Sequence, residues 1–293
     1  MYTDSHAHLS SVAEELGEDA LAGVLSAYAR AWEAALPGIP AAASAPGPAG
    51  PAGARGRGRP APLLVDIGTE PGDYAARRAL LVRLSGGAAL PPWLRMSLGV
   101  WPGREALAEP RAALVRLTDA LAAAGAEAAA IGECGLDYHH MDGSRAAQAE
   151  LFEGQIGLAR ERGLALVVHS REAFEDTRDI LRAARLASPV LIHCFGYGRK
   201  EAEAFLELGA YLSFAGNLTY KKAEALREAL AAAPADRLLL ETDAPYMNPE
   251  PRRGRPSSPS DIARSYEAAA ALRGEAAESL AASVAANARL LFG

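Results

Sequence analysis

The chain has 293 residues, of which half are apolar, and its 36 acidic and 30 basic side chains leave a net charge of −6. This length suffices for one large domain or two small ones, and the apolar half can form a sizeable core. The acidic balance argues against a polycation that binds nucleic acid or membranes through non-specific charge, so an anionic polymer would have to be bound through metal ions or a local cluster of arginines.

The first predicted element is a short strand that ends in the motif Asp4-Ser5-His6-Ala7-His8. Side chains alternate between the two faces of a strand, so His6 and His8 point to the same side. Two neutral imidazoles placed in this way can bind one metal ion of the zinc type. A pair of surface histidines near the N-terminus is the alternative, and the positions of the other histidines and carboxylates decide between the two.

A low-complexity segment, residues 37–62, follows a helical pattern over residues 14–36. It is almost entirely Pro, Gly and Ala, with Arg55, Arg57 and Arg59 as its only charges. Such a composition cannot bury a core, so we interpret the segment as a mobile insertion loop and not as a domain boundary. Because it follows the first strand, we expect it to lie over the face where that strand ends. Its arginines could meet a nucleic-acid backbone there, and a loop without function is the alternative.

Short apolar runs then alternate with helical patterns along the rest of the chain. The predicted strands cover residues 63–68, 95–100, 128–133, 164–169, 189–193, 211–214 and 237–241, and the predicted helices cover 74–84, 111–124, 146–162, 172–187, 200–208, 222–232 and 261–292. Continuous apolar runs are typical of parallel strands buried on both faces. Counting the first strand, this alternation predicts a single-domain (β/α)8 TIM barrel of the α/β class over residues 1–293, with an open doubly wound sheet as the alternative.

Metal-binding residue types recur where these strands end. They are His6 and His8 on the first strand, Glu133 on the fourth, His169 on the fifth, His193 on the sixth and Asp243 after the eighth. The active sites of such barrels lie at the C-terminal ends of the strands, so these side chains would meet at one mouth. Six nitrogen and oxygen ligands are too many for one zinc ion and enough for two divalent ions that share a bridging carboxylate. A single histidine of this kind would more often be a core residue, but the recurrence favours a metal site in a barrel.

Five motifs carry a resemblance to a known family. They are Asp4-Ser5-His6-Ala7-His8-Leu9, Glu133-Cys134-Gly135-Leu136-Asp137-Tyr138, His169-Ser170-Arg171, His193-Cys194-Phe195 and Glu241-Thr242-Asp243-Ala244-Pro245-Tyr246. In this order and spacing they resemble the motifs of the TatD-type metal-dependent hydrolases, the TatD-related deoxyribonucleases of the amidohydrolase superfamily. The resemblance extends over nearly the whole chain, and it implies the barrel fold together with a hydrolase activity.

The resemblance also implies a role for each site residue. It implies that His6, His8 and Asp243 hold a first ion, that His169 and His193 hold a second, that Glu133 bridges both and that Arg171 lies near a substrate phosphate. The residues themselves agree on the bridge, because related barrels often use a carboxylated lysine and no lysine here lies at a strand end. Asp243 and Glu133 are then the catalytic residues, with Asp243 as the proton acceptor. The two ions would be Mg²⁺, Mn²⁺ or Zn²⁺.

Three functions are consistent with this site. The resemblance implies hydrolysis of phosphodiester bonds by a water that the metal ions activate, with DNA as the expected substrate and RNA as an alternative. A hydrolase of small esters, lactones or amides is the second, because the same metal pair can polarise a carbonyl group. A non-catalytic metal-binding or interaction protein is the third, and the complete ligand set argues against it.

We expect a cytoplasmic protein without a membrane segment or an obligate protein partner. The first residues lack the basic and apolar pattern of a signal peptide, and no apolar run is long enough to cross a bilayer. The two cysteines, Cys134 and Cys194, lie far apart, which is typical of a reducing compartment. Each follows a predicted ligand, so strand alternation predicts that both thiols point away from the metals as buried structural groups.

The other polar and aromatic residues near strand ends leave two interpretations each. His139 and His140 are either solvated loop residues or contacts for a phosphate. Trp101 and Tyr138 either stack on a base or pack against the protein. Asp66 is expected to be a hydrogen-bonding loop residue.

One loop departs from the family pattern. Where the family has Arg-Gly-Lys-Arg-Asn-Glu-Pro, this chain has Arg253-Gly254-Arg255-Pro256-Ser257-Ser258-Pro259. The change removes no predicted ligand, but it leaves open how this loop supports the metal mouth. Gly254 with Arg252, Arg253 and Arg255 is either an anion-binding loop or a solvated turn.

Overall fold

The computed structural model describes residues 1–35 and 61–293. At its centre is a sheet of eight parallel strands, each paired with the strand that follows it in the chain. The strands are β1 (Asp4–Ala7), β2 (Leu64–Asp66), β3 (Leu94–Leu98), β4 (Ala128–Asp137), β5 (Ala165–Arg171), β6 (Val190–Ile192), β7 (Tyr211–Phe214) and β8 (Leu238–Leu240). The sheet closes because Ala7 forms a parallel bridge with Ala244, and the His8 amide donates to the Ala244 carbonyl at 2.8 Å. The predicted (β/α)8 barrel is confirmed.

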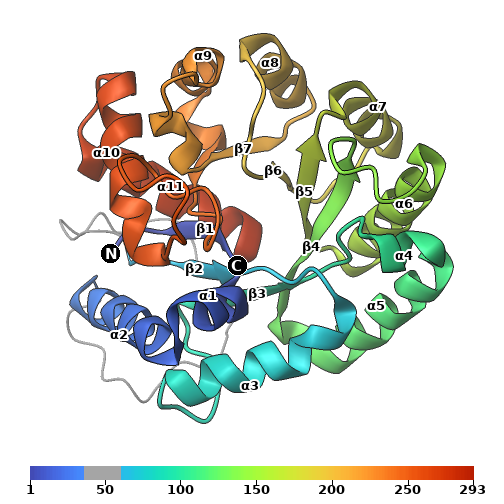
Figure 1. Ribbon diagram of the computed structural model, residues 1–293, viewed down its shortest axis with the longest axis horizontal. Helices are drawn as coiled ribbons and strands as arrows, with labels where there is room; N and C mark the ends of the chain where they lie inside the picture. The colour runs from blue at the N-terminus through green and yellow to red at the C-terminus, as the bar shows by residue number, and fades with distance from the viewer. Residues whose placement is uncertain (36–60) are drawn as a thin grey trace.

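The helices form a ring around the strands (Figure 1). They are α1 (Leu9–Leu16) and α2 (Glu18–Ala35) after β1, α3 (Tyr74–Leu84) after β2, α4 (Arg104–Ala108) and α5 (Pro110–Ala124) after β3, α6 (Arg145–Arg162) after β4, α7 (Phe174–Ala184) after β5, α8 (Arg199–Glu207) after β6, α9 (Glu224–Ala232) after β7, and α10 (Ile262–Arg273) and α11 (Ala277–Phe292) after β8. Short 3-10 helices are η1 (Pro71–Asp73), η2 (Gly125–Glu127), η3 (Gly216–Thr219), η4 (Ala235–Arg237) and η5 (Pro259–Asp261).

The apolar runs that predicted the strands are buried between the barrel interior and this ring of helices. In β8, Leu238, Leu239 and Leu240 are all fully buried, and so are Val167 and Val168 of β5. Each such side chain contributes about 1.5–3 kcal/mol through its removal from water. Side chains that fill the barrel hold the strands in a rigid frame, and the polar residues at the strand ends are presented on that frame.

Two differences from the predicted elements affect the site. The helix predicted over residues 14–36 is two helices, α1 and α2, separated at Gly17, whose φ of +91° suits glycine. The fourth strand continues beyond Glu133 to Asp137, so it carries both carboxylates. Between them Gly135 has a φ of +134°, and a Cβ there would collide with the carbonyl of His169, so a glycine is required where β4 approaches β5. The other predicted boundaries move by three residues or fewer, and α4 was not predicted.

The Pro/Gly/Ala segment lies almost entirely outside the described residues, and so do its arginines Arg55, Arg57 and Arg59. Only the residues that flank it are described. It follows the C-terminal end of α2, and after it the Leu63 amide donates to Thr3 Oγ1 at 3.1 Å as the chain enters β2. The N-terminal ends of the strands lie opposite the metal mouth. The expectation that the segment lies over the mouth falls on residues outside the described part of the chain and stays a prediction.

A buried carboxylate aligns β1 with the segment after β8. Asp4 is fully buried and accepts hydrogen bonds from the Thr242 amide at 2.9 Å, the Thr242 hydroxyl at 2.7 Å and the His6 amide at 3.3 Å. Burial raises the pKa of Asp4 to about 8, although the hydrogen bonds from Thr242 and His6 oppose the rise. Asp4 lies two residues before His6, and Thr242 directly precedes Asp243. This contact therefore helps to fix how β1 and the segment after β8 approach each other at the site.

No helix within residues 1–35 and 61–293 is long and apolar enough to cross a membrane.

Candidate metal centre

All six predicted ligands meet at the C-terminal mouth of the barrel. His6 lies in β1, His8 directly after it, Glu133 in β4, His169 in β5, His193 directly after β6 and Asp243 after β8. All except His169 are at least nine-tenths buried. Residues more than two hundred positions apart thus share one small volume, because the closed sheet brings the first and last strands together.

The first group of ligand atoms consists of His6 Nε2, His8 Nε2, Asp243 Oδ1 and Glu133 Oε2. The two nitrogens lie 3.3 Å apart. They lie 3.7 and 3.6 Å from Asp243 Oδ1 and 3.4 and 3.5 Å from Glu133 Oε2. Both nitrogens thus lie within 3.7 Å of each of the two carboxylate oxygens.

The second group uses the other oxygen of the same glutamate. Glu133 Oε1 lies 3.0 Å from His169 Nδ1 and 3.1 Å from His193 Nε2. The two nitrogens lie 3.3 Å apart. Glu133 thus directs one carboxylate oxygen to each group.

These spacings fit metal ions. An ion with four ligands at about 2.0–2.2 Å in tetrahedral geometry would hold neighbouring ligand atoms about 3.3–3.6 Å apart. The separations within both groups, 3.0 to 3.7 Å, are close to this value. His6, His8 and Asp243 form one cluster that could hold an ion, and Glu133, His169 and His193 form another. A third such cluster, His6, His193 and Glu241, joins histidines of both sets, so the division of the ligands between two ions stays a prediction.

Hydrogen bonds orient three of the four histidines. His169 Nε2 lies 3.0 Å from Asp137 Oδ2, so Nδ1 is the nitrogen free to face the second group. His8 Nδ1 lies 3.2 Å from the Ile67 carbonyl, which leaves Nε2 for the first group. Metal-binding histidines commonly use their second nitrogen in this way, because the outer hydrogen bond selects the tautomer and fixes the ring.

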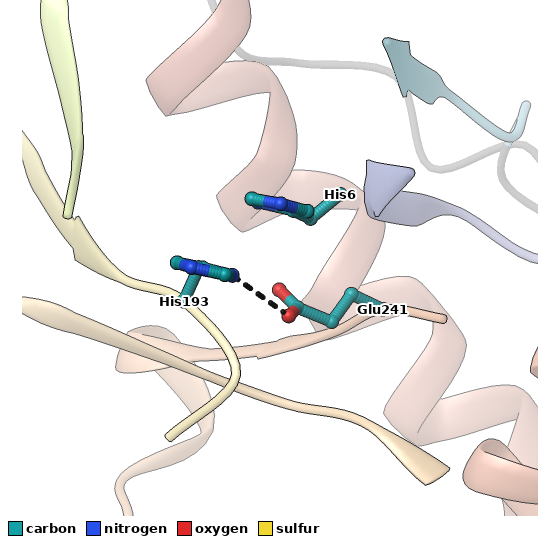
Figure 2. A group of neighbouring side chains, drawn as sticks. All are labelled: His6, His193 and Glu241. Carbon is teal, nitrogen blue, oxygen red and sulfur yellow. Dashed lines mark hydrogen bonds and ion pairs between the residues drawn. The ribbon is translucent and has the colours of Figure 1, made fainter. Parts of the chain in front are cut away.

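Glu241 provides the corresponding contact for His193. Figure 2 shows the His6 and His193 rings one above the other, with centroids 3.9 Å apart, and Glu241 beside them. Glu241 Oε1 lies 3.4 Å from His193 Nδ1 and accepts the Cys194 amide at 2.8 Å. Its Oε2 and His6 Nδ1 are buried and hydrogen-bond to no atom of the described residues. Glu241 is thus in position to restrain histidines of both groups.

The sequence interpretation missed these two outer carboxylates, although both stand inside the quoted motifs. Asp137 lies four residues beyond Glu133 on the same strand, and side chains four apart on a strand share a face. Glu241 precedes Asp243 by two residues, just after β8. The alternation rule that pairs His6 with His8 also pairs Glu133 with Asp137, but it does not reach Glu241, because β8 ends at Leu240 and Asp243 has a φ of +55°.

Burial and charge together set the protonation of the cluster. Burial alone would lower the pKa of His193, but Glu133 and Glu241 hold that pKa well above its usual value. Burial and the neighbouring His193 lower the pKa of His6, so this ring favours the neutral form that a metal requires. Burial would raise the pKa of Glu133, but His193 and His169 outweigh it and hold that pKa well below its usual value. The bridging candidate is therefore ionised.

Arg171 is the last residue of β5, two positions after His169 and on the same face of the strand. Its side chain is exposed and pairs with no carboxylate among the described residues. Trp101 also lies at the mouth, with its ring centroid 6.0 Å from that of His169. Tyr138 instead points outward, where its hydroxyl donates to Asp176 at 2.5 Å and Arg145 covers its ring at 4.1 Å. Of the two aromatic candidates for stacking, Trp101 alone faces the metal ligands.

The histidine pair after β4 is half-exposed and partnered. His139 Nδ1 lies 2.8 Å from Glu172, and His140 Nδ1 lies 2.9 Å from Asp137. Asp66 forms hydrogen bonds as expected, since its carboxylate accepts the Leu9 amide at 3.0 Å and pairs with Arg77, but it is a buried residue of β2 and not a loop residue.

The prediction for the cysteines was correct for one of them. Cys134 is fully buried and donates to the Val167 carbonyl at 3.4 Å. Cys194 is only partly buried, and its thiol lies against Asp243. The reason is local, because β6 ends at Ile192 and a φ of +41° at Cys194 breaks the alternation of side chains. Burial and the nearby carboxylates raise the pKa of this thiol well above its usual value, so it is not an activated nucleophile.

Comparisons with known proteins agree with this arrangement. A family model described as TatD related DNase matches residues 3–293. YcfH of Escherichia coli K12, named an uncharacterized metal-dependent hydrolase, is 41% identical over 153 residues, which cover 52% of this chain and 58% of YcfH. A protein of Erwinia tasmaniensis named 3'-5' ssDNA/RNA exonuclease TatD is 41% identical over 170 residues, which cover 56% of this chain and 65% of that protein. The chain thus matches about three fifths of the length of these curated relatives.

Among solved structures, YjjV of Escherichia coli K12, described as a TatD homolog, is similar with a TM-score of 0.69 and 29% identity. The match covers 78% of this chain and 86% of YjjV.

Proposed function

This chain belongs to the TatD-related DNase family, and we propose that it is a hydrolase that cleaves phosphodiester bonds of nucleic acid with two divalent ions at the barrel mouth. The observation that carries the proposal is the position of Glu133, which directs one oxygen to each of two histidine-containing groups. Two ions bridged by one carboxylate form a symmetric clamp suited to in-line displacement at phosphorus. The printed name of the Erwinia tasmaniensis relative, a 3'-5' ssDNA/RNA exonuclease, supports single-stranded DNA or RNA as the substrate.

Each ion would have its own ligands besides the shared Glu133. His6, His8 and Asp243 would hold the first ion, and His169 and His193 would hold the second. Imidazole ligands favour Zn²⁺, whereas carboxylate and water ligands suit Mg²⁺ and Mn²⁺, and phosphoryl chemistry often uses Mg²⁺.

When bound, the ion pair supplies a water nucleophile at neutral pH and stabilises negative charge on the phosphoryl oxygens. The residues of the chain position and complete this chemistry. Asp243, whose pKa is lowered by His8 and His6 against the effect of burial, is ionised and accepts the proton of the attacking water. Arg171, exposed at the mouth with an uncommitted guanidinium, contacts the phosphate and stabilises charge in the transition state.

The test is product analysis on end-labelled single-stranded DNA, duplex DNA and RNA, with Mg²⁺, Mn²⁺ or Zn²⁺ supplied in turn. We expect shortened products with at least one ion, and none after Asp243→Asn. A protein that cleaves no nucleic acid with any ion but hydrolyses a simple ester or lactone would overturn the proposal in favour of the carbonyl hydrolase. Release of mononucleotides from one labelled end would identify an exonuclease and its direction.

A further inference from the structure

Unpaired positive side chains gather on one side of the mouth. The chain contains three lysines, Lys200, Lys221 and Lys222, and each lies in or just before the first turn of α8 or α9, on the mouth face. Lys221 and Lys222 are exposed, and neither pairs with a carboxylate of the described residues. The same holds for Arg253 and Arg255 in the loop after β8. The chain as a whole carries a net charge of −6, so the gathering of unpaired cations on one side of the mouth is a local feature and does not follow from the overall composition.

Neighbouring arginines are neutralised by carboxylates, in contrast to these four. Arg199 pairs with Glu203 at 2.7 Å, and Arg227 pairs with Glu224 at 3.3 Å. Carboxylates are thus available in this part of the barrel, but they pair with Arg199 and Arg227 and not with the four cations of the loops. The cations of the two loops remain free for an anionic ligand.

The loops after β7 and β8 form one continuous surface. Arg253 lies over the ring of Tyr220 at 4.3 Å, and the Tyr220 hydroxyl donates to the Asn248 carbonyl at 3.1 Å. Asn248 in turn donates its side-chain amide to the Pro256 carbonyl at 2.9 Å. These contacts place Lys221, which follows Tyr220, beside the basic end of the second loop. They also show how the loop that departs from the family pattern is held in this chain.

Tyr246 joins this surface to the metal ligands. Its amide donates to the Asp243 carbonyl at 2.8 Å, and its ring meets that of His8 edge-on with centroids 5.9 Å apart. The residue is 57% exposed, and no other Phe, Tyr or Trp among residues 1–35 and 61–293 is exposed to this degree. Ser257 fixes the backbone here, because its hydroxyl donates to the Tyr246 carbonyl and its amide to that of Pro245. Solvent exposure of a restrained aromatic ring beside a metal ligand suits a stacking platform.

The charges around Tyr246 indicate from which side an anionic strand would approach the site. Glu14 and Glu15 of α1, the helix that follows His8, are exposed and pair with no basic side chain among the described residues. A polyanion would be repelled on the α1 side and attracted on the side of the two loops.

We propose that the loops after β7 and β8 bind the substrate strand on its way to the metal centre, with phosphates facing Lys221, Lys222, Arg253 and Arg255 and a base stacked on Tyr246. The inference rests on the proposed function and adds to it the place of the strand. Stacking on Tyr246 requires a base that is not enclosed in a duplex, so the surface suits a single strand or a frayed end.

The test is binding of a fluorescent single-stranded oligonucleotide in the presence of a chelator, so that no turnover occurs. The variant K221A/K222A/R255A is compared with the control R30A/R116A/R162A, which removes three exposed and unpaired arginines from the outer helices. Both lower the net charge by three. Because single-strand binding falls with salt at a slope of about 0.7 per phosphate contact, we expect the first variant to flatten that slope by about 2 and to weaken binding about 100-fold near 0.1 M salt. The control should match wild type in both measurements.

Tyr246→Ala and Tyr246→Phe test the stacking separately. Loss of one stacked base weakens binding about 5- to 160-fold, so the alanine variant should lose affinity by a factor in this range and the phenylalanine variant should bind like wild type. Equal binding and equal salt slopes for the loop variant, the control and wild type would overturn the inference. If wild type nevertheless cleaves nucleic acid when metal is supplied, the proposed function stands and only the strand path is wrong. Unchanged melting temperatures confirm that the variants fold.

Discussion

Replacement of Glu133 by glutamine tests the bridged metal centre most directly. The substitution keeps the size of the side chain and exchanges one carboxylate oxygen for an amide nitrogen, which donates hydrogen bonds and cannot bind a cation. In the structure, Oε2 lies 3.4 and 3.5 Å from the nitrogens of His6 and His8. Oε1 lies 3.0 and 3.1 Å from those of His169 and His193. A glutamine can therefore serve one group only.

The expected result follows from the ligands that remain. Without Glu133, the first group keeps three ligands and the second keeps two histidines. We expect Glu133→Gln to bind one ion tightly where wild type binds two, and to lose on the order of 100-fold or more in turnover, the scale of one lost electrostatic contact to the transition state. The barrel should still fold, because Glu133 lies at the mouth and not in the packed layers.

Glu241→Gln is the matched control, because it makes the same chemical change in a buried glutamate of the same site. Glu241 is not one of the six predicted ligands and lies 3.4 Å from His193 Nδ1, and loss of such an outer partner costs about 10- to 100-fold in metal affinity. This variant should therefore bind two ions at saturation, the second more weakly. Calorimetric titration measures the affinity for each ion, and elemental analysis after gel filtration measures how many ions stay bound. Two tightly bound ions and near-normal turnover in Glu133→Gln would refute the bridge and the division of the ligands.

Three further outcomes are expected. Activity should disappear with a chelator and return with a divalent ion, and full turnover after exhaustive demetallation would refute the metal mechanism. Asp4→Ala should lower the free energy of unfolding by about 2–4 kcal/mol, because the buried amides of Thr242 and His6 lose their acceptor. Asp4→Asn keeps one acceptor oxygen, so its loss of unfolding free energy, measured by chemical denaturation, should be clearly smaller. Glu127→Gln should cost about 1 kcal/mol or less at pH 7, since the contact with Arg78 is partly exposed. Arg78 lowers the pKa of Glu127, so the carboxylate stabilises the fold above its usual pKa, and the difference from wild type should vanish as the pH falls through the folded value.

The fold and the ligand set could be predicted from the sequence because both depend on local patterns. Apolar runs of strand length alternate with helical patterns, which is typical of parallel strands buried on both faces, and the recurrence of metal-binding residue types at the strand ends favours the closed barrel over an open sheet. In that arrangement every strand end reaches the same mouth. His6 and His8 share a face by alternation alone, and the same rule would have added Asp137 on β4.

The tertiary structure decided what depends on contacts between distant segments. Whether His169 faces the second group through Nδ1 or Nε2 follows from Asp137, and the orientation of His193 follows from Glu241, which lies 48 residues further along the chain. Cys194 turns toward Asp243 because β6 ends at Ile192 and Cys194 itself has a left-handed backbone conformation. No alternation rule anticipates this turn. The basic surface beside Tyr246 exists only because two loops separated by a helix and a strand pack on each other. Sequence patterns determine which face of an element a side chain occupies, whereas barrel closure determines which atoms of remote elements come within reach.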